Sequence, residues 1–294
     1  MERSRPSDQE QPGKPVTSIS LLTPEFLAHP GKGETMTDQE SVVLPPHVHD
    51  PESLPPEVRA AAEGSLLTYW QDRVGQHVHD SYAGVRLMKF PEDLRMFEHL
   101  LWLSRAQVVV ELGTHSGGSA LWFRDRLRVL AAYGLVPQDI RVVSVDLSQK
   151  HTHDVLAAAD SRYAEDITLL DGDVLDPGTS VRVAECIPQG ARCLVVEDIR
   201  HAYETTYAGL SHYSRFVPED GFFVVEDGVI DSPELCVHIK PPGETGGVVS
   251  AVQDWLSTDQ GKAFQKRSDL NRYGISCRNM WLRRTADTAP APAS

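Results

Sequence analysis

Acidic residues end two of the most apolar segments of the sequence. The segments LVVEDIRH, at 194–201, and FVVEDGVID, at 223–231, each carry a Glu-Asp pair after a run of β-branched residues. The four acids are Glu197, Asp198, Glu226 and Asp227. If these segments are neighbouring strands, up to four carboxylates share one cleft, and like charges there are costly unless a cation or a proton intervenes. Hard oxygen ligands without an accompanying cysteine favour Mg2+, with Mn2+ or Ca2+ as alternatives.

Strand geometry limits how these acids can share an ion. Successive residues of a strand point to opposite faces, so both members of a Glu-Asp pair can bind one ion only where the strand gives way to a turn. The sequence Asp227-Gly228 permits such a turn. The alternative is that Glu197 and Glu226 cap strand ends or pair with Arg200 and Arg192, with no metal involved.

One of the 12 histidines stands out by its position. His201 follows Asp198 by three residues and begins the run HAYETTYAGLSHYSRF, which has helical spacing. If this run is a helix, Asp198 and His201 lie close on one face. A neutral imidazole beside a metal site is well placed to take a proton from a hydroxyl. The ordinary alternative for any one histidine is a surface or capping role.

The segment VVVELGTHSGGSALWF, at 108–123, predicts a buried strand, a glycine turn and a helix that begins near Ser119. It is not a dinucleotide fingerprint, because His115 stands two residues after Gly113, and no Gly-Lys-Ser/Thr phosphate loop follows. Glycines let backbone approach a ligand, and a helix N-terminus offers N–H groups to a carboxylate. Glu111 would face a cation, through an amino group of the ligand or through bound water, and the turn predicts a small-molecule site. A purely structural turn is the alternative.

Apolar segments rich in β-branched residues alternate with helical stretches along the rest of the chain, a pattern typical of a parallel sheet covered on both faces. The predicted strands are 108–112, 142–147, 167–173, 193–198 and 222–227. The C-terminal segment RYGISCRNMWLRR predicts a hairpin with Arg278 and Asn279 near its turn. The fold class is therefore α/β. Asp146 ends the second strand, where an acid can accept ribose hydroxyls, although acids at strand ends also serve solubility and capping.

Composition narrows the function classes. The 294 residues carry a formal net charge of −14, and no basic patch is evident, so we expect no nucleic-acid partner. The four cysteines show no metal-site spacing, and no run is long enough to span a membrane. We expect a soluble cytoplasmic protein with no membrane partner.

The chain divides by composition into four segments. Residues 1–55 are rich in proline and polar residues and predict a flexible tail. Residues 56–105 predict an N-terminal helical segment, with helices at 56–70 and 91–105. The ligand-binding domain is expected at 106–285, and 286–294 is expected to be a disordered tail.

These motifs resemble those of known families. The turn E-x-G-x-x-x-G is similar to the first motif of class I S-adenosylmethionine (SAM) methyltransferases. From about residue 80 to 285 the chain resembles the cephalosporin hydroxylase family and, more loosely, the metal-dependent macrolide-sugar O-methyltransferases of antibiotic biosynthesis. The resemblance rests on GVRLMKFPEDL, with Lys89, Pro91 and Asp93, on the glycine turn, on VVEDIRH and on GFFVVEDGVID. Family members commonly carry Asp-Ser-Asp-His where this chain has Asp198-Ile199-Arg200-His201, so a role of the inner acid is in doubt here.

The resemblance implies a Rossmann-like class I SAM methyltransferase fold, with a mostly parallel seven-stranded sheet, helices on both faces and an N-terminal helical extension. It implies that Mg2+ is held by Asp198, Glu226 and Asp227, with His201 as the catalytic base. The residues that it implies for SAM are Glu111, Gly113, Ser116, Gly117, Ser119, Asp146 and Asp173. Of these, Asp173 is expected at the adenine amino group.

We therefore expect a Mg2+-dependent O-methyltransferase that acts on a hydroxyl of a secondary metabolite, a sugar or polyhydroxylated natural product, in antibiotic biosynthesis. The family also implies a homo-oligomer. One alternative is a component of a β-lactam hydroxylation and methoxylation system, although no two-His-one-carboxylate iron site is evident. The other is a non-catalytic partner subunit with the same fold.

Overall fold

A seven-stranded sheet lies at the centre of the computed structural model, which describes residues 70, 73, 75–232, 246–272, 276–277 and 279–285. The strand order is β5-β4-β3-β6-β7-β9-β8. The strands are β3 (Val108–Leu112), β4 (Arg141–Asp146), β5 (Ile167–Asp171), β6 (Cys193–Glu197), β7 (Phe222–Val225), β8 (Phe264–Lys266) and β9 (Trp281–Arg284). Strands β3 to β7 pair in parallel, whereas β9 is antiparallel to both β7 and β8. The predicted mostly parallel seven-stranded sheet is confirmed.

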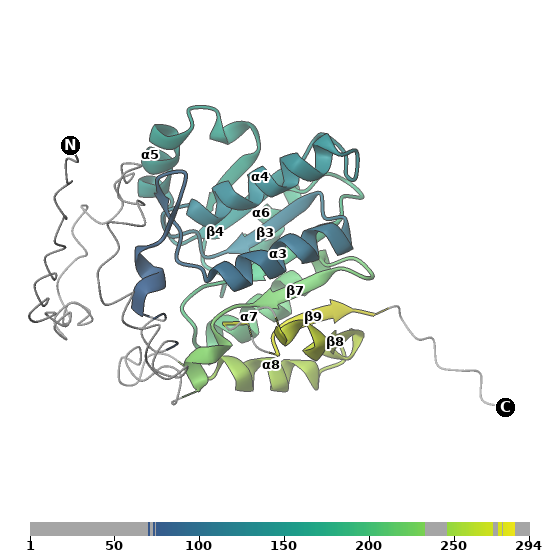
Figure 1. Ribbon diagram of the computed structural model, residues 1–294. Helices are drawn as coiled ribbons and strands as arrows, with labels where there is room; N and C mark the ends of the chain where they lie inside the picture. The colour runs from purple at the N-terminus through teal and green to yellow at the C-terminus, as the bar shows by residue number, and fades with distance from the viewer. Residues whose placement is uncertain are drawn as a thin grey trace, which may run out of the picture.

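Helices cover both faces of this sheet (Figure 1). The helices are α3 (Pro91–Ser104), α4 (Gly118–Ala132), α5 (Lys150–Ala159), α6 (Pro177–Cys186), α7 (Tyr203–Tyr213) and α8 (Val248–Leu256). Ser119 of α4 hydrogen-bonds to Glu111 of β3, whereas a Cβ on Gly209 of α7 would touch Leu112 of the same strand. Since neighbouring residues of a strand point to opposite faces, α4 and α7 lie on opposite sides.

The apolar character of the strands explains why both faces are covered. Every residue of β3, β6 and β7 is buried, including the glutamates Glu111 and Glu197. A strand without an exposed face is stable only between two layers of helices. On one side, the Phe97 ring of α3 meets Phe123 of α4 and Trp281 of β9 edge to face, at centroid distances of 5.3 and 5.9 Å. The predicted helix before the first strand is thereby joined to the core.

The order of the strands fixes where a ligand can bind. The chain runs from β3 outward to β4 and β5, and then returns to β6 on the other side of β3. The connections after β3 and β6 therefore leave the sheet in opposite directions. In open α/β sheets the crevice at such a switch point, outside the carboxyl ends of the strands, is where ligands bind.

The C-terminal hairpin was predicted with the wrong partner strand. Strand β9 pairs with β8, at Phe264–Lys266, and Ser276 and Cys277 lie in a turn instead of a strand. The β8 segment has only three residues and follows a short 3-10 helix, so its pattern carries little strand signal. Residues 273–275 and 278, the predicted helix at 56–69 and both predicted tails lie outside the described residues.

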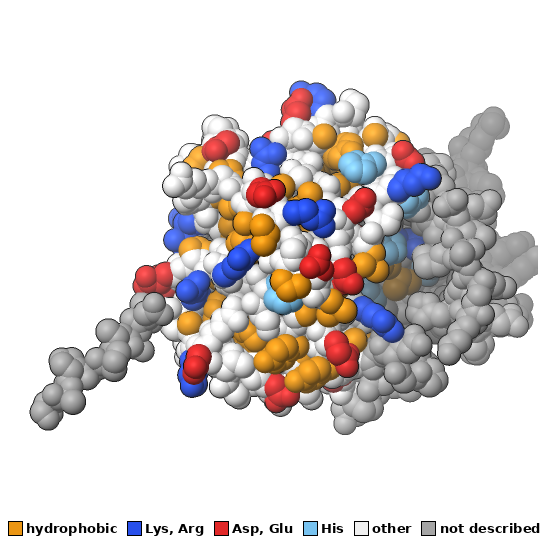
Figure 2. All heavy atoms as spheres, turned by 180° about the vertical axis from the view of Figure 1, so that it is seen from behind, with side chains coloured by type: hydrophobic (Ala, Val, Ile, Leu, Met, Phe, Trp, Pro, Cys, Tyr) orange, Lys and Arg blue, Asp and Glu red, His pale blue; other side chains and the backbone are white. Residues whose placement is uncertain are grey.

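The surface shows no segregation of charge on the face turned toward the reader in Figure 2, where acidic and basic side chains are interspersed with apolar ones. Within the part of the chain that the structure describes, none of the helices is long and apolar enough to cross a membrane.

The start of α4 provides a test of this packing. The two-stranded hairpin of β1 (Ser81–Tyr82) and β2 (Val85–Arg86) lies so close to α4 that a Cβ on Gly118 would stand 2.1 Å from the backbone oxygen of Arg86. We expect Gly118→Ala to lower the free energy of unfolding by about 2 kcal/mol or more, because backbone must move to relieve the overlap. Urea denaturation measures this loss.

Gly75→Ala is the matched control, because a Cβ there would have no neighbour within 4 Å among the residues that the structure describes. It is expected to change the free energy of unfolding by less than about 0.5 kcal/mol. Equal stability of the two variants would contradict the close contact between the hairpin and α4.

Candidate active site

A cavity of about 520 Å³ opens at the carboxyl ends of the parallel strands, at the switch point of the sheet. Its wall is built from the turns that follow β3, β4, β5 and β6 and from residues 86–89. The predicted site residues in the wall are Gly113, Ser119, Asp146, Asp173, Asp198 and His201. The structure thus brings the predicted cofactor site and part of the predicted metal site into one cavity.

Asp146 fixes the glycine turn. Its Oδ2 accepts hydrogen bonds from the backbone N–H groups of Thr114 and His115, both at 3.0 Å, and its Oδ1 accepts from Leu147 at 2.7 Å. A carboxylate has about four acceptor sites. Asp146 therefore holds the turn and still has acceptor capacity on the cavity side.

Gly113 is required by its own backbone conformation and by the close approach of the neighbouring strand end. Its φ is +99°, and a Cβ at this position would stand 1.8 Å from the backbone oxygen of Asp198. Asp198 in turn donates its N–H to the carbonyl of Leu112 at 2.8 Å. The glycine turn and the acidic end of β6 are therefore in direct backbone contact.

Three of the predicted cofactor residues lie behind the cavity wall. Gly117 packs against α5, where a Cβ would be 3.0 Å from Thr152 and Leu156. The Ser116 hydroxyl lies 2.9 Å from Nδ1 of His115. Glu111 is fully buried beneath the turn. Direct contact of these three side chains with a cofactor stays a prediction.

Glu111 occupies a polar pocket inside the core. It accepts hydrogen bonds from the hydroxyl groups of Ser119 and Ser144, while its Oε1 is buried with no hydrogen-bond partner among the described residues. Burial raises the pKa of Glu111 to about 7, against the opposing effect of the Lys89 charge. The side chain therefore changes charge near neutral pH.

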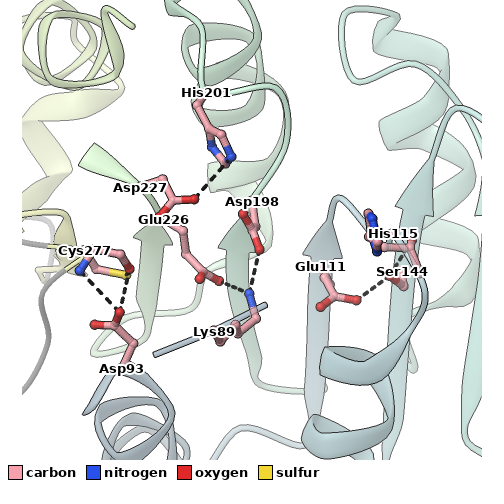
Figure 3. A network of polar contacts seen from close by, with 12 residues as sticks. Lys89, Asp93, Glu111, His115, Ser144, Asp198, His201, Glu226, Asp227 and Cys277 are labelled. Carbon is pink, nitrogen blue, oxygen red and sulfur yellow. Dashed lines mark hydrogen bonds and ion pairs between the residues drawn. The ribbon is translucent and has the colours of Figure 1, made fainter. Parts of the chain in front are cut away.

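Three of the predicted chemical groups form a cluster with metal-ligand spacing. One side-chain atom each of Asp198, His201 and Asp227 lies within 4.8 Å of the others. His201 Nε2 is 3.2 Å from Asp227 Oδ2, as Figure 3 shows. Burial alone would lower the pKa of His201, but the Asp227 and Asp198 carboxylates outweigh that effect and raise it. The imidazole therefore carries positive charge more readily than an ordinary histidine.

The backbone holds this cluster in an unusual conformation. His201 and Asp227 have positive φ values, 50° and 52°, which are uncommon outside glycine and concentrate at functional sites. The predicted helix begins only at Tyr203, so the expectation that His201 shares a helical face with Asp198 is wrong. Gly246 fixes the turn instead, because its N–H donates to the His201 carbonyl at 2.7 Å and its carbonyl accepts from Tyr203.

Glu226 points away from this cluster, toward a lysine. Its Oε1 lies 2.5 Å from Nζ of Lys89, which is also 2.7 Å from Oδ2 of Asp198 (Figure 3). Burial and the nearby Asp198 raise the pKa of Glu226 well above its ordinary value, and the Lys89 charge opposes that rise. Metal binding by Glu226 stays a prediction. The alternative of an arginine partner is wrong for Arg192, which donates to the carbonyls of Ser104 and Glu219.

Sequence reasoning named Lys89 only as part of the motif GVRLMKFPEDL and gave it no role, although only 2% of its side chain is exposed. Burial alone would lower the pKa of Lys89, but Asp198 and Glu226 outweigh it and raise the pKa well above its ordinary value. The available signal was a lone lysine inside the apolar run LMKF. Its acidic partners are 109 and 137 residues away, beyond the reach of local spacing.

The family model for rhamnosyl O-methyltransferase/CmcI matches residues 75–285. The chain belongs to this family. The predicted resemblance is confirmed, and the match covers the sheet, the cavity and the acidic cluster.

Relatives and solved structures agree with this membership. The rhamnosyl O-methyltransferases of Mycobacterium tuberculosis and Mycobacterium bovis are 23% identical over 176 residues, which is 59% of this chain and 64% of theirs. The match thus spans less than two thirds of these relatives' length. The Mg-SAM form of CmcI is 19% identical, with a TM-score of 0.52, and the match covers 71% of this chain and 78% of CmcI. The CmcI apo-structure is 20% identical, with a TM-score of 0.51, and the match covers 71% of this chain and 77% of that one. The fold is that of class I SAM methyltransferases.

The buried Glu111 predicts a pH-dependent stability. Because its pKa is raised in the folded state, Glu111 contributes its full stabilisation of the fold below pH 4.5, its unfolded pKa, and this stabilisation is lost as pH rises through about 7. The unsubstituted protein should therefore lose up to about 3 kcal/mol of unfolding free energy between these two pH values, and Glu111→Gln should not show this loss. Urea denaturation across the range measures it.

Glu185→Gln, at an exposed position of α6, is the control and should leave the pH profile unchanged. A profile of Glu111→Gln that parallels that of the unsubstituted protein would show that burial does not perturb Glu111.

Proposed function

We propose that this chain is a SAM-dependent O-methyltransferase that uses a divalent cation, Mg2+, and methylates a hydroxyl of a sugar or polyhydroxylated natural product in antibiotic biosynthesis. The observation that carries the proposal is the single cavity lined by Gly113, Asp146 and Asp173 on one side and by Asp198 and His201 on the other. Its volume of about 520 Å³ suits a small-molecule cofactor. Membership of the rhamnosyl O-methyltransferase/CmcI family supports the same activity.

The residues of the cavity fit SAM. The N-terminus of α4 begins at Gly118, in the cavity wall, and offers N–H groups and a positive dipole to the methionyl carboxylate. Asp146 retains acceptor capacity for a ribose hydroxyl. Asp173, in the turn after β5, lines the same cavity, which supports its assignment to the adenine amino group. SAM, when bound, supplies an electrophilic methyl group.

The acidic cluster fits a divalent cation. The Asp198 and Asp227 carboxylates and the His201 imidazole have the spacing of a metal site. The two carboxylates would hold the ion, which leaves the imidazole free to act as a base, and oxygen ligands favour Mg2+. A divalent cation, when bound, supplies positive charge that favours loss of a proton from an acceptor hydroxyl.

His201 is the residue that we assign as the base. His201 lines the cavity together with Asp198, and the Asp227 carboxylate, 3.2 Å from Nε2, orients the ring. The raised pKa favours the charged imidazole, which cannot accept a proton, so the base must lose this charge before it acts. Catalysis then rests on positioning the hydroxyl close to the methyl donor and to the imidazole nitrogen that does not face Asp227.

The proposal extends to the partners of the chain. The cavity suits a small-molecule natural-product acceptor. We further propose a homo-oligomer in the cytoplasm, without nucleic-acid or membrane partners.

Asp198→Ala tests the cation. We expect Mg2+ binding, measured by titration calorimetry on the full chain, to weaken by about 100-fold or more, because a direct ligand and its charge are lost. The affinity for SAM, measured without Mg2+, should stay within about threefold of that of the unsubstituted chain. The loss of one charged contact with SAM would change this affinity by more than that. Asp259→Ala, which removes a 99% exposed aspartate, is the control and should bind Mg2+ normally. Retained Mg2+ affinity in Asp198→Ala would place the cation elsewhere.

His201→Ala tests the base. With a panel of glycosylated and polyhydroxylated acceptors, mass spectrometry identifies the methylated product and S-adenosylhomocysteine formation gives the rate. We expect turnover to fall by about 100-fold or more while SAM affinity stays within about threefold. His79→Ala, at an exposed position, should retain turnover. Undiminished turnover in His201→Ala would remove His201 from the mechanism.

A further inference from the structure

Lys89 joins the two acidic strand ends from a third segment of the chain. Its ammonium lies 2.7 Å from Asp198 at the end of β6 and 2.5 Å from Glu226 at the end of β7. The lysine itself comes from the connection between β2 and α3, and Figure 3 shows it between the two carboxylates. With 3% exposure it is enclosed by protein, yet it forms part of the cavity wall.

Stability alone is a weak explanation for this arrangement. A buried ion pair gains little over well-packed apolar side chains, because desolvation offsets the attraction between the charges. The Phe97 ring lies under the ammonium, with its centroid 5.9 Å from Nζ, and at this distance it adds only a weak cation–π contact. The position of the Lys89 ammonium points to a role in the site, because it contacts Glu226 and also Asp198, which is a member of the metal-ligand cluster.

We propose that Lys89 is a positioning residue that holds the Asp198 and Glu226 carboxylates in place and sets the negative charge available to a divalent cation. This inference rests on the proposed function. An ammonium donates up to three hydrogen bonds, so it can fix two carboxylates at once. Asp198 meets Lys89 through Oδ2 and keeps a second oxygen for a cation. Because like charges repel, the ammonium also weakens cation binding and keeps it reversible.

Lys89→Met tests this role, since it retains the stem and removes the charge. We expect the thermal midpoint in EDTA to fall by about 6 °C or more, because the buried carboxylates lose their counter-ion. We also expect Mg2+ alone, titrated by calorimetry at one fixed pH, to bind about tenfold or more tighter, and to raise the thermal midpoint more than in the unsubstituted chain. A lysine that only fills space would not change Mg2+ affinity.

Lys262→Met is the matched control, because this lysine pairs with Asp259 on the surface, and it should leave both measurements unchanged. The double variant Lys89→Met/Glu226→Gln removes the Glu226 charge together with the lysine charge that neutralises it. In EDTA, its thermal midpoint should recover most of the decrease that Lys89→Met causes. If Lys89→Met alone does not fold, the double variant replaces it in both measurements. Failure of the double variant to recover would overturn the proposal.

Two negative results are distinguishable. If the unsubstituted chain binds Mg2+ and Lys89→Met binds it with the same Kd, the role of Lys89 is overturned and the proposed function stands. If the unsubstituted chain gives no Mg2+ binding at all, the cation of the proposed function is excluded, and the role of Lys89 falls with it.

Discussion

Repulsion between carboxylates is the constraint on which this end of the molecule depends. Parallel strands deliver their carboxyl ends to one edge of the sheet, and here β6 and β7 deliver Asp198, Glu226 and Asp227 to the same place. Water cannot screen the buried members of this group, so a carboxylate must take up a proton, which the raised pKa of Glu226 favours, or positive charge must come from the protein or from a ligand. Lys89 provides part of that charge, and His201, with its raised pKa, provides more in the metal-free chain.

The same geometry couples the two halves of the cavity. The Gly113 turn touches the backbone of Asp198, and Asp146 locks that turn through Thr114 and His115. A shift of the glycine turn therefore moves the acidic end of β6 with it. A methyl donor held by the turn and a hydroxyl held near the acids are thus positioned by one continuous piece of backbone, which is what a reaction governed by orientation requires.

Local patterns in the sequence predicted the parts of this structure that depend on local order. The parallel strands, the helices α3 and α4 and the meeting of Asp198 with Asp227 follow from apolar runs and from the rule that parallel strands end at one edge. His201 reaches the same cluster from the turn before α7, and not through the helical face that its spacing predicted. The β8 partner of β9 is too short to leave a pattern. The Lys89 contacts and the contact between Gly113 and Asp198 join segments far apart in the chain, which spacing cannot reveal.

The central claim is that a divalent cation and SAM share the cavity at the ends of β3 and β6. Anomalous diffraction from crystals of the full chain grown with Mn2+ and S-adenosylhomocysteine tests it most directly. The account predicts an anomalous peak in contact with the Asp198 and Asp227 carboxylates, with the nucleoside bound against the Gly113 turn. A bound nucleoside with no peak at those carboxylates, or Mn2+ bound away from this cavity, would contradict it.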